Sequence, residues 1–227
     1  MRLLLIRHGQ TPNNVTGAID TAIPGAGLTQ LGHTQAAAVP PALDNEHIAG
    51  IYASRLTRTQ LTAAPLAQVR GLPVRIAPGL EEISAGALEM RTDHDSVRGY
   101  ADCLASWVLG NLGYALPGGI TGHQFWDTYN GAINTLASGH DPGSTLAVFS
   151  HGAAIRVYAA IATGMPPETV RDLWLANTGM CVLEGDPAAG WQVAHWNSTP
   201  LGGAELMDLR ANDVTGESVD EIDSATS

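Results

Sequence analysis

The sequence predicts an α/β fold, a three-layer α/β/α sandwich around a mostly parallel central sheet. Short apolar runs alternate along the chain with longer stretches of helical pattern, and this alternation is typical of parallel strands joined by helical crossovers. Two of the apolar runs lead into a His-Gly pair, the run at 3–6 through Arg7 and the run at 144–150 directly. The 227 residues, 44% of them hydrophobic, are enough for a sizeable core.

The first half of the chain predicts three strands and two helices. Arg7 and His8 follow the apolar run of the opening strand, and Gly9 then lets the backbone turn sharply. A Gly/Pro/Thr-rich loop follows at residues 12–27, and Thr29 is a suitable N-cap for the next helix. The elements expected in order are a strand at 3–6, a helix at 28–43, a strand at 50–54, an alanine-rich helix at 59–69 and a strand at 73–77.

The second half predicts helices, one strong strand and a closing hairpin. Residues 93–138 have a helical pattern that is broken by the Gly/Pro turn at 116–122. The strand at 144–150 precedes a helix at 153–163, which repeats the arrangement at the start of the chain. Two further strands, at 180–183 and 191–196, flank a Gly/Pro-containing turn and predict a hairpin.

Charge divides the chain into a domain at residues 1–204 and an acidic C-terminal tail at 205–227. The formal net charge is −11, and the tail holds seven acids against Arg210. We expect this Ser/Thr-rich tail to be flexible. The remaining body is only mildly acidic and has no basic stripe, which argues against nucleic acid as a partner. A small anionic molecule remains possible where a few arginines converge.

All eleven basic residues are arginine, and the sequence contains no lysine. This excludes Schiff-base chemistry and the lysine of a nucleotide-binding P-loop. Two cysteines in a chain of this size are typical of a reducing compartment. Residues 1–6 are too short for a signal peptide, and no apolar run approaches the length of a membrane span. We therefore expect a cytoplasmic protein with no membrane partner.

Chemically active side chains follow several of the predicted strands. Arg7 and His8 end the first strand, Arg58 follows the second, Glu82 lies in the loop after the third, and His151 ends the strong strand. The carboxyl ends of strands in open α/β sheets form ligand sites. A neutral imidazole can attack phosphorus, arginines bind the charged phosphoryl oxygens, and a carboxylic acid can protonate the leaving oxygen. This set of groups suits phosphoryl transfer without a metal.

The same segments resemble the histidine phosphatase superfamily, also called the phosphoglycerate mutase-like family. The resemblance covers most of the chain and depends on the order of several short motifs. They are Leu-Leu-Ile-Arg7-His8-Gly9-Gln10-Thr11 with Asn14, Leu28-Thr-Gln-Leu-Gly32 with Gln35-Ala36, Ser54-Arg-Leu-Thr-Arg58-Thr59 with Thr62-Ala63, Leu80-Glu-Glu82 with Gly86, Val148-Phe-Ser-His151-Gly152, and Asn177-Thr178.

The resemblance implies a role for each matching residue. His8 would be the phosphorylated nucleophile, and Glu82 the proton donor. Arg7, Arg58 and His151 would bind the phosphoryl oxygens, with further hydrogen bonds from Asn14 and the backbone amide of Gly152. No cofactor and no metal are implied. The partner would be a small-molecule phosphate ester, and family habit makes a homodimer possible.

Several alternatives stay open at this point. Leu88, Met90 and Ile120 depart from the family pattern, so a weakly active binding or regulatory protein is one alternative, and a phosphoglycerate mutase is another. Arg55 competes with Arg58, and Glu81 with Glu82, but only the second of each pair falls on the family position. The Asp93-His-Asp95-Ser-Val97 segment spells another phosphatase motif, D-x-D-x-[TV], without the apolar strand that should precede it. The sequence does not identify the substrate.

Overall fold

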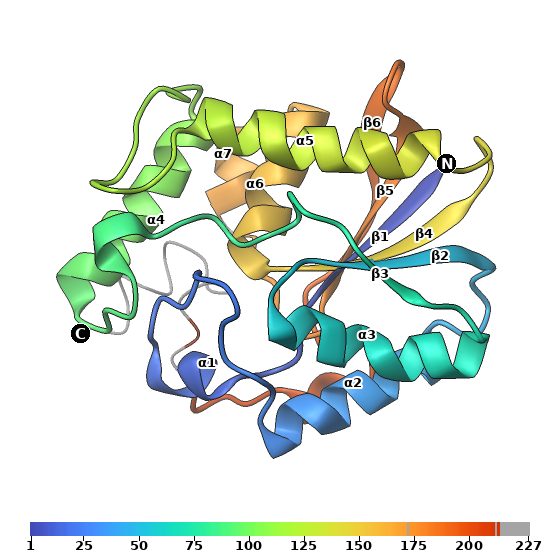
Figure 1. The fold of residues 1–227 in the computed structure, drawn as a ribbon. Coiled ribbons are helices and arrows are strands. Elements are labelled where there is room, and N and C mark those ends of the chain that lie inside the picture. The colour runs from blue at the N-terminus through green and yellow to red at the C-terminus, as the bar shows by residue number, and fades with distance from the viewer. Residues whose placement is uncertain (172, 212, 214–227) are drawn as a thin grey trace.

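The computed structural model describes residues 1–171, 173–211 and 213, with a six-stranded sheet at its centre (Figure 1). The strand order is β3-β2-β4-β1-β5-β6. The strands are β1 (Arg2–Arg7), β2 (Ile48–Ala53), β3 (Val74–Ile76), β4 (Thr145–Ser150), β5 (Met180–Asp186) and β6 (Gly190–Asn197).

Four of these strands, β1 to β4, are parallel, while β5 and β6 form an antiparallel hairpin beside β1. β1 and β4 are neighbours at the centre, and both are buried almost along their full length. Burial on both sides explains why their sequences are continuous apolar runs rather than alternating ones. The expected mostly parallel sheet and closing hairpin are confirmed.

Helices cover both faces of the sheet, as Figure 1 shows, with α2 and α3 below it and α4, α5 and α6 above it. Successive side chains of a strand point to opposite faces. Leu3 and Leu5 accordingly enter the core beneath α4–α6, whereas Leu4 and Ile6 enter the core shared with α2 and α3. The helices are α1 (Pro12–Thr16), α2 (Gln30–Ala42), α3 (Thr57–Arg70), α4 (His94–Val108), α5 (Gly122–Ser138), α6 (Gly152–Thr163) and α7 (Pro167–Arg171), with short 3-10 turns η1 (Gly86–Leu88) and η2 (Ala204–Leu206).

Capping fixes where the helices near the carboxyl ends of the strands begin. Thr29 caps α2 by accepting a hydrogen bond from the amide of Gly32, as the sequence predicts. The segment at 12–27, expected as loop, contains the short helix α1. Thr11 and Asn14 form a reciprocal capping box there, which satisfies backbone donors that a loop would leave to water.

The end of the described chain lies against the domain. The amide nitrogen Nε2 of Gln35 donates to the carbonyl of Leu206 over 2.8 Å, and Nε2 of Gln10 donates to Asp208 over 2.9 Å. Leu206 and Asp208 thus pack against the domain, although they belong to the tail that we expect to be flexible. The expected flexibility of the tail concerns mainly residues 212 and 214–227, which lie outside the described residues.

Within the described residues, none of the helices has both the length and the apolar character needed to cross a membrane.

Candidate active site

The pairing of β1 with β4 brings the two predicted histidines together. Arg7 pairs with Ser150 in the parallel register, so the next residues, His8 and His151, leave the sheet side by side. The amide of His8 donates to the carbonyl of Ser150 over 3.1 Å, and the two imidazole centroids lie 5.3 Å apart. Both rings are buried, at 2% and 0% exposure. Residues 143 positions apart in the sequence thus form one centre.

The His8 ring is held in a defined tautomer. Its Nδ1 lies 2.8 Å from the carbonyl oxygen of Gly9, which can only accept a hydrogen bond, so Nδ1 carries the proton. The other nitrogen, Nε2, is then the one with a free lone pair. Burial first, and then the charges of Arg58 and Arg7, lower the pKa of His8 well below its usual value. The ring is therefore neutral, as a nucleophile must be.

The loop that carries His8 is fixed by close backbone contact. A Cβ on Gly9 would lie 2.7 Å from the carbonyl oxygen of Gly32, and a Cβ on Gly32 would lie 2.2 Å from that of Gln10. The amide of Gly9 also donates to Oγ1 of Thr62, which lies on α3. The turn after β1 is thus packed against the starts of α2 and α3, and only glycine fits at the two contact points.

His151 is held from the neighbouring strand. Ser54 follows β2, and its Oγ lies 2.8 Å from Nε2 of His151. Oγ1 of Thr59 lies 2.8 Å from the carbonyl of Leu56, to which it donates its hydrogen, so the Ser54 hydroxyl is able to donate to His151. Nδ1 of His151 is buried and has no partner within the described part of the chain. Desolvation lowers the pKa of this imidazole well below its usual value.

Arg7 and Asn14 bind one common group. Arg7 is fully buried, and its Nη1 donates to the carbonyl of Leu175 over 2.7 Å. Nη1 and Nη2 also contact the two carboxylate oxygens of Asp213, each over 2.6 Å, and Nδ2 of Asn14 donates to the same carboxylate over 2.9 Å. The structure therefore brings together two of the predicted phosphate ligands and places an anion on them.

Arg58 lies in the first turn of α3 and is 2% exposed. Its Nη2 donates to the carbonyl of Asp20 over 2.8 Å, and its Nη1 lies 3.3 Å from Oδ2 of the same residue. Arg58 and His8 are close enough for the arginine charge to lower the imidazole pKa. Arg55, its competitor in the sequence, instead forms an ion pair with Glu81, and its side chain is 51% exposed. The structure thus brings Arg58, rather than Arg55, to the buried centre.

Glu82 lies at the N-terminus of α6, in electrostatic reach of Arg58 and Arg7. Its carboxylate accepts from the amide of Ala154 over 2.8 Å and from that of Ala153 over 3.3 Å. Gly152 opens this helix, and the amides that donate to Glu82 belong to the two residues after it. A contact between the amide of Gly152 and a phosphoryl oxygen stays a prediction. Burial raises the pKa of the carboxyl group, against the opposing effect of the amides and arginines. A raised pKa favours the protonated form that a general acid needs.

Buried hydroxyl groups fix the loop that carries Glu82. Ser150, the last residue of β4, donates its hydroxyl to the carbonyl of Leu80 over 2.8 Å, and Tyr129 donates to Ser150 over 3.0 Å. The hydroxyl of Tyr100 donates to the carbonyl of Ile83 over 2.8 Å. The residues on either side of the carboxylate are thus tied to β4, α5 and α4.

The three departures from the family pattern lie around this loop. Leu88 and Ile120 are partly buried and pack against the core above the sheet. Met90 is half exposed, adopts a left-handed backbone with φ of 60°, and has its amide bound to the carbonyl of Ile19. Leu88 and Ile120 therefore have packing roles, and Met90 is a strained residue near the turn that holds Asp20.

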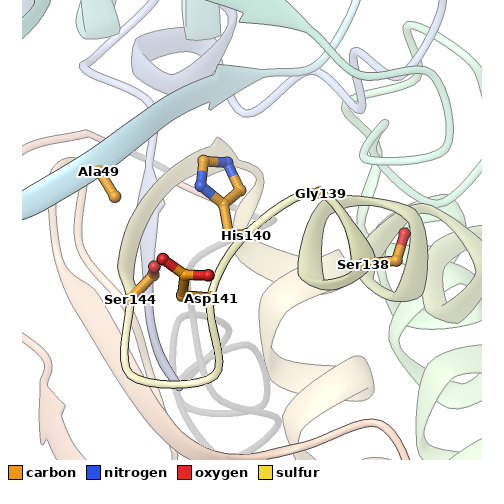
Figure 2. A pocket seen from close by; sticks show the side chains of 6 residues that line it. All are labelled: Ala49, Ser138, Gly139, His140, Asp141 and Ser144. Atoms are coloured by element: carbon orange, nitrogen blue, oxygen red, sulfur yellow. The ribbon is translucent and has the colours of Figure 1, made fainter.

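A separate pocket of about 390 Å³ lies at the other end of the sheet (Figure 2). Ala49 at the start of β2 and the loop before β4 line it, with His140, Asp141 and Ser144 among the side chains shown. Nε2 of His140 is already bound to the hydroxyl of Tyr52 over 2.7 Å. This pocket is at the amino ends of the strands, whereas the candidate site is at their carboxyl ends.

Comparison with known families identifies the superfamily of the chain. The model of the histidine phosphatase superfamily (branch 1) matches residues 3–199. The chain belongs to this superfamily. The match includes every site residue from Arg7 to His151, whereas Asp213 lies beyond its end.

Relatives of this histidine phosphatase carry varied names. The PE-PGRS family protein PE_PGRS11 of Mycobacterium tuberculosis is 36% identical over 88% of the chain, which spans only 37% of that protein. A probable phosphoglycerate mutase GpmB of Yersinia enterocolitica is 27% identical, over 94% of the chain and 98% of the relative. The solved mycobacterial glucosyl-3-phosphoglycerate phosphatase, in complex with VO3, superposes with a TM-score of 0.74 at 25% identity, over 87% of this chain and 99% of that one.

Sequence reasoning missed three residues of the histidine phosphatase site. Ser54 lies in one of the family motifs, but the sequence indicates no role for it because its partner, His151, is distant in sequence. Asp20 lies in the loop at 12–27, and nothing in the sequence around it indicates a bond to Arg58. Asp213 was assigned to a flexible tail on composition alone. Ser54 lies at the end of a predicted strand, and this position of a polar residue is the signal in the sequence that could have indicated a site residue.

Proposed function

We propose that this chain is a phosphatase that hydrolyses small phosphate monoesters through a phosphohistidine at His8, without a metal ion. One observation carries the proposal: two neutral, buried imidazoles lie 5.3 Å apart beside buried arginines, and Nδ1 of His8 is tied to Gly9 so that Nε2 is free to attack. Belonging to the histidine phosphatase superfamily supports the same chemistry.

In the first step, Nε2 of His8 attacks phosphorus and the ester oxygen leaves. Arg7, Arg58 and Asn14 hold the phosphoryl oxygens, and Nδ1 of His151 donates a further hydrogen bond to them. These donors are positioned before the reaction by their own contacts, so little reorganisation is needed as charge moves onto the phosphoryl oxygens. The products of this step are phosphohistidine and an alcohol.

Glu82 supplies the proton that the leaving oxygen needs and recovers one from water in the second step. Its pKa, which burial raises, supports the first role, because a higher pKa favours the protonated form that can donate to the leaving oxygen. Once ionised, it accepts the amides of Ala153 and Ala154 and can remove a proton from the water that attacks phosphorus. Hydrolysis then releases inorganic phosphate and restores neutral His8.

The substrate is proposed only as a class, a small phosphorylated molecule. The structural relative solved with VO3 is a phosphatase of glucosyl-3-phosphoglycerate, by its name a small phosphate ester. No contact of the described residues selects a leaving group.

The direct test is phosphate release from p-nitrophenyl phosphate and a panel of small phosphate esters, with EDTA present throughout. We expect the wild-type protein to turn over and His8→Ala to be inactive but folded. His33→Ala, at an exposed histidine of α2, is the matched control and should keep wild-type rates. An acid-labile phosphoenzyme, trapped during turnover in wild type and missing in His8→Ala, would identify the intermediate.

Two other outcomes point to the alternatives. The chain is 27% identical to a probable phosphoglycerate mutase over 98% of that relative, and this makes phosphoryl transfer between substrates the second candidate. Product analysis with a phosphoglycerate as substrate distinguishes this transfer from hydrolysis. If wild type and His8→Ala are both inactive while inorganic phosphate raises the melting temperature of wild type, the chain is a phosphate-binding protein instead of an enzyme.

We propose the cytoplasm as the compartment, because Cys103 and Cys181 are both buried free thiols. Cell fractionation tests this. A disulfide-forming compartment would contradict it.

A further inference from the structure

We infer that Asp213 is an intramolecular ligand of the phosphoryl site, and that a substrate has to displace it. Its carboxylate binds the guanidinium of Arg7 with both oxygens, each over 2.6 Å, and accepts from Nδ2 of Asn14 over 2.9 Å. The inference rests on the proposed function, since it takes Arg7 and Asn14 as phosphate ligands. It adds a residue from the end of the described chain to the residues that govern substrate affinity.

The geometry of the contact is that of an anion in its binding site. A guanidinium presents parallel N–H groups that match two oxygens of a carboxylate or of a phosphoryl group equally well. Arg7 is fully buried, and the side chain of Asp213 is 17% exposed, so this ion pair is shielded from solvent far more than an ordinary surface pair. Arg7 cannot present the same two N–H groups to Asp213 and to a phosphoryl group at once. Occupation by one excludes the other.

The preceding residues hold the carboxylate near the site. Leu206 accepts from Gln35, and Asp208 accepts from Gln10, two residues after His8. The five steps along the chain from residue 208 to residue 213 span at most about 18 Å when extended. A carboxylate tethered within that distance has a high effective concentration at Arg7 without any external ligand. Displacement therefore needs only local movement of the segment, while the anchors at 206 and 208 stay in place.

The competition sets a threshold for ligands. A phosphoryl group has three oxygens and up to two negative charges, against two oxygens and one charge for the carboxylate. A phosphate monoester therefore competes for Arg7 and Asn14 more strongly than a singly charged anion does. The apparent dissociation constant rises by the inverse of the fraction of molecules with an open site. If about one molecule in ten is open, removing the competitor lowers the apparent constant about tenfold.

The test compares wild type with Asp213→Asn, which removes the charge and one acceptor oxygen. Glu205→Gln is the matched control, because it removes one acidic charge from an exposed residue of the same segment that contacts neither Arg7 nor Asn14 in the described structure. The measurements are the affinity for inorganic phosphate by calorimetry, and KM and kcat with p-nitrophenyl phosphate. We expect Asp213→Asn to bind phosphate about tenfold more tightly, with KM lowered to match and kcat unchanged, and Glu205→Gln to behave as wild type.

Three results separate the possibilities. Equal phosphate affinity and KM in wild type and Asp213→Asn would overturn the inference while leaving the phosphatase proposal intact. Weaker binding in Asp213→Asn would overturn it too, because Asp213 would then position Arg7 instead of competing for it. If none of the three proteins binds phosphate or releases it from esters, the proposed function itself fails. An equal increase in phosphate affinity in Asp213→Asn and Glu205→Gln would show that the change in net charge causes the increase, and it would also overturn the inference.

Discussion

Replacing Ser54 with alanine tests whether a single buried hydroxyl sets the tautomer of His151. In the wild-type chain, Oγ of Ser54 lies 2.8 Å from Nε2 of His151 and accepts from the amide of Leu56 over 3.2 Å. With the hydroxyl donating to Nε2, the ring proton resides on Nδ1, which is the buried nitrogen without a partner in the described residues. Ser54→Ala frees the proton to move to Nε2, and the donor to the phosphoryl oxygens is lost.

The expected effects of Ser54→Ala on kcat/KM and on stability follow from the hydrogen-bonding groups that it leaves unpaired. Loss of one fully preorganised donor to a developing oxyanion costs about 2.7–4 kcal/mol. His151 remains present and can return to the productive tautomer, so we expect about half of that loss. On the scale of about 1.4 kcal/mol per decade, this is a fall in kcat/KM of about tenfold to thirtyfold. Leaving a buried donor and acceptor unsatisfied also costs about 1–3 kcal/mol of stability, which for a chain of this size lowers the melting temperature by about 2–4 °C for each kcal/mol.

Steady-state kinetics and thermal unfolding together decide the matter. Ser106→Ala is the matched control, because its hydroxyl donates only to the carbonyl of Cys103 within α4. We expect it to keep wild-type kinetics. A Ser54→Ala protein that unfolds cooperatively and retains wild-type kcat/KM would refute the argument that Ser54 orients His151. A drop in melting temperature alone would show a structural role without a catalytic one.

The remaining predictions concern charge and protonation. Asp20→Asn should lower kcat/KM about tenfold by loosening Arg58, on the scale of one charge-assisted hydrogen bond; wild-type kinetics would show that Arg58 needs no such partner. The pH profile of kcat/KM should be bell-shaped, because His8 must be neutral and Glu82 protonated; the pKa of His8 is lowered and that of Glu82 is raised. Glu82→Gln should slow the hydrolysis of alkyl esters more than that of p-nitrophenyl phosphate, because the nitrophenolate leaving group needs little protonation. The pKa of His151 is lower in the folded chain than in the unfolded chain, so the unfolded chain takes up the proton first as the pH falls below about 6.5. The free energy of unfolding therefore declines as the pH falls through this range. The drop in melting temperature from pH 7 to pH 5 should be smaller in His151→Gln. Overnight dialysis against EDTA should leave the rate unchanged, and restoration of a lost rate by magnesium or zinc would contradict the metal-free mechanism.

Most of the sheet could be predicted because its signals are local. The run from Leu3 to Ile6 is apolar at every position, since both faces of β1 are covered, and Thr29 caps α2 with its own side chain. The helix α1 was not predicted, because five residues carry little periodicity and its stability comes from the reciprocal bonds of Thr11 and Asn14. Short elements held by side-chain caps are hard to predict from composition.

Within the site, sequence order predicted which groups converge but not how each is held. The His-Gly pairs after two strands indicated His8 and His151, and the register of β1 with β4 is what makes them neighbours. The bonds of Arg58 to Asp20 and of Arg7 to Asp213 join segments distant in sequence, and no periodic pattern encodes them. Composition was misleading for residue 213, since an acidic segment is typically solvated unless a buried cation lies within reach.

The neighbouring positions of β2, β4 and β1 couple ligand binding to the cooperativity of the whole domain. Site residues follow each of these three strands, so an anion held by them joins the carboxyl ends of the central sheet, and those ends cannot separate without releasing it. A ligand that binds only the native state stabilises it by about 2.7 kcal/mol at a concentration one hundred times its dissociation constant. Amide exchange along β1 and β4 should therefore slow when phosphate or vanadate is added, including at amides far from the anion. An anion bound at one end of the sheet thus raises the free energy of unfolding of the whole domain.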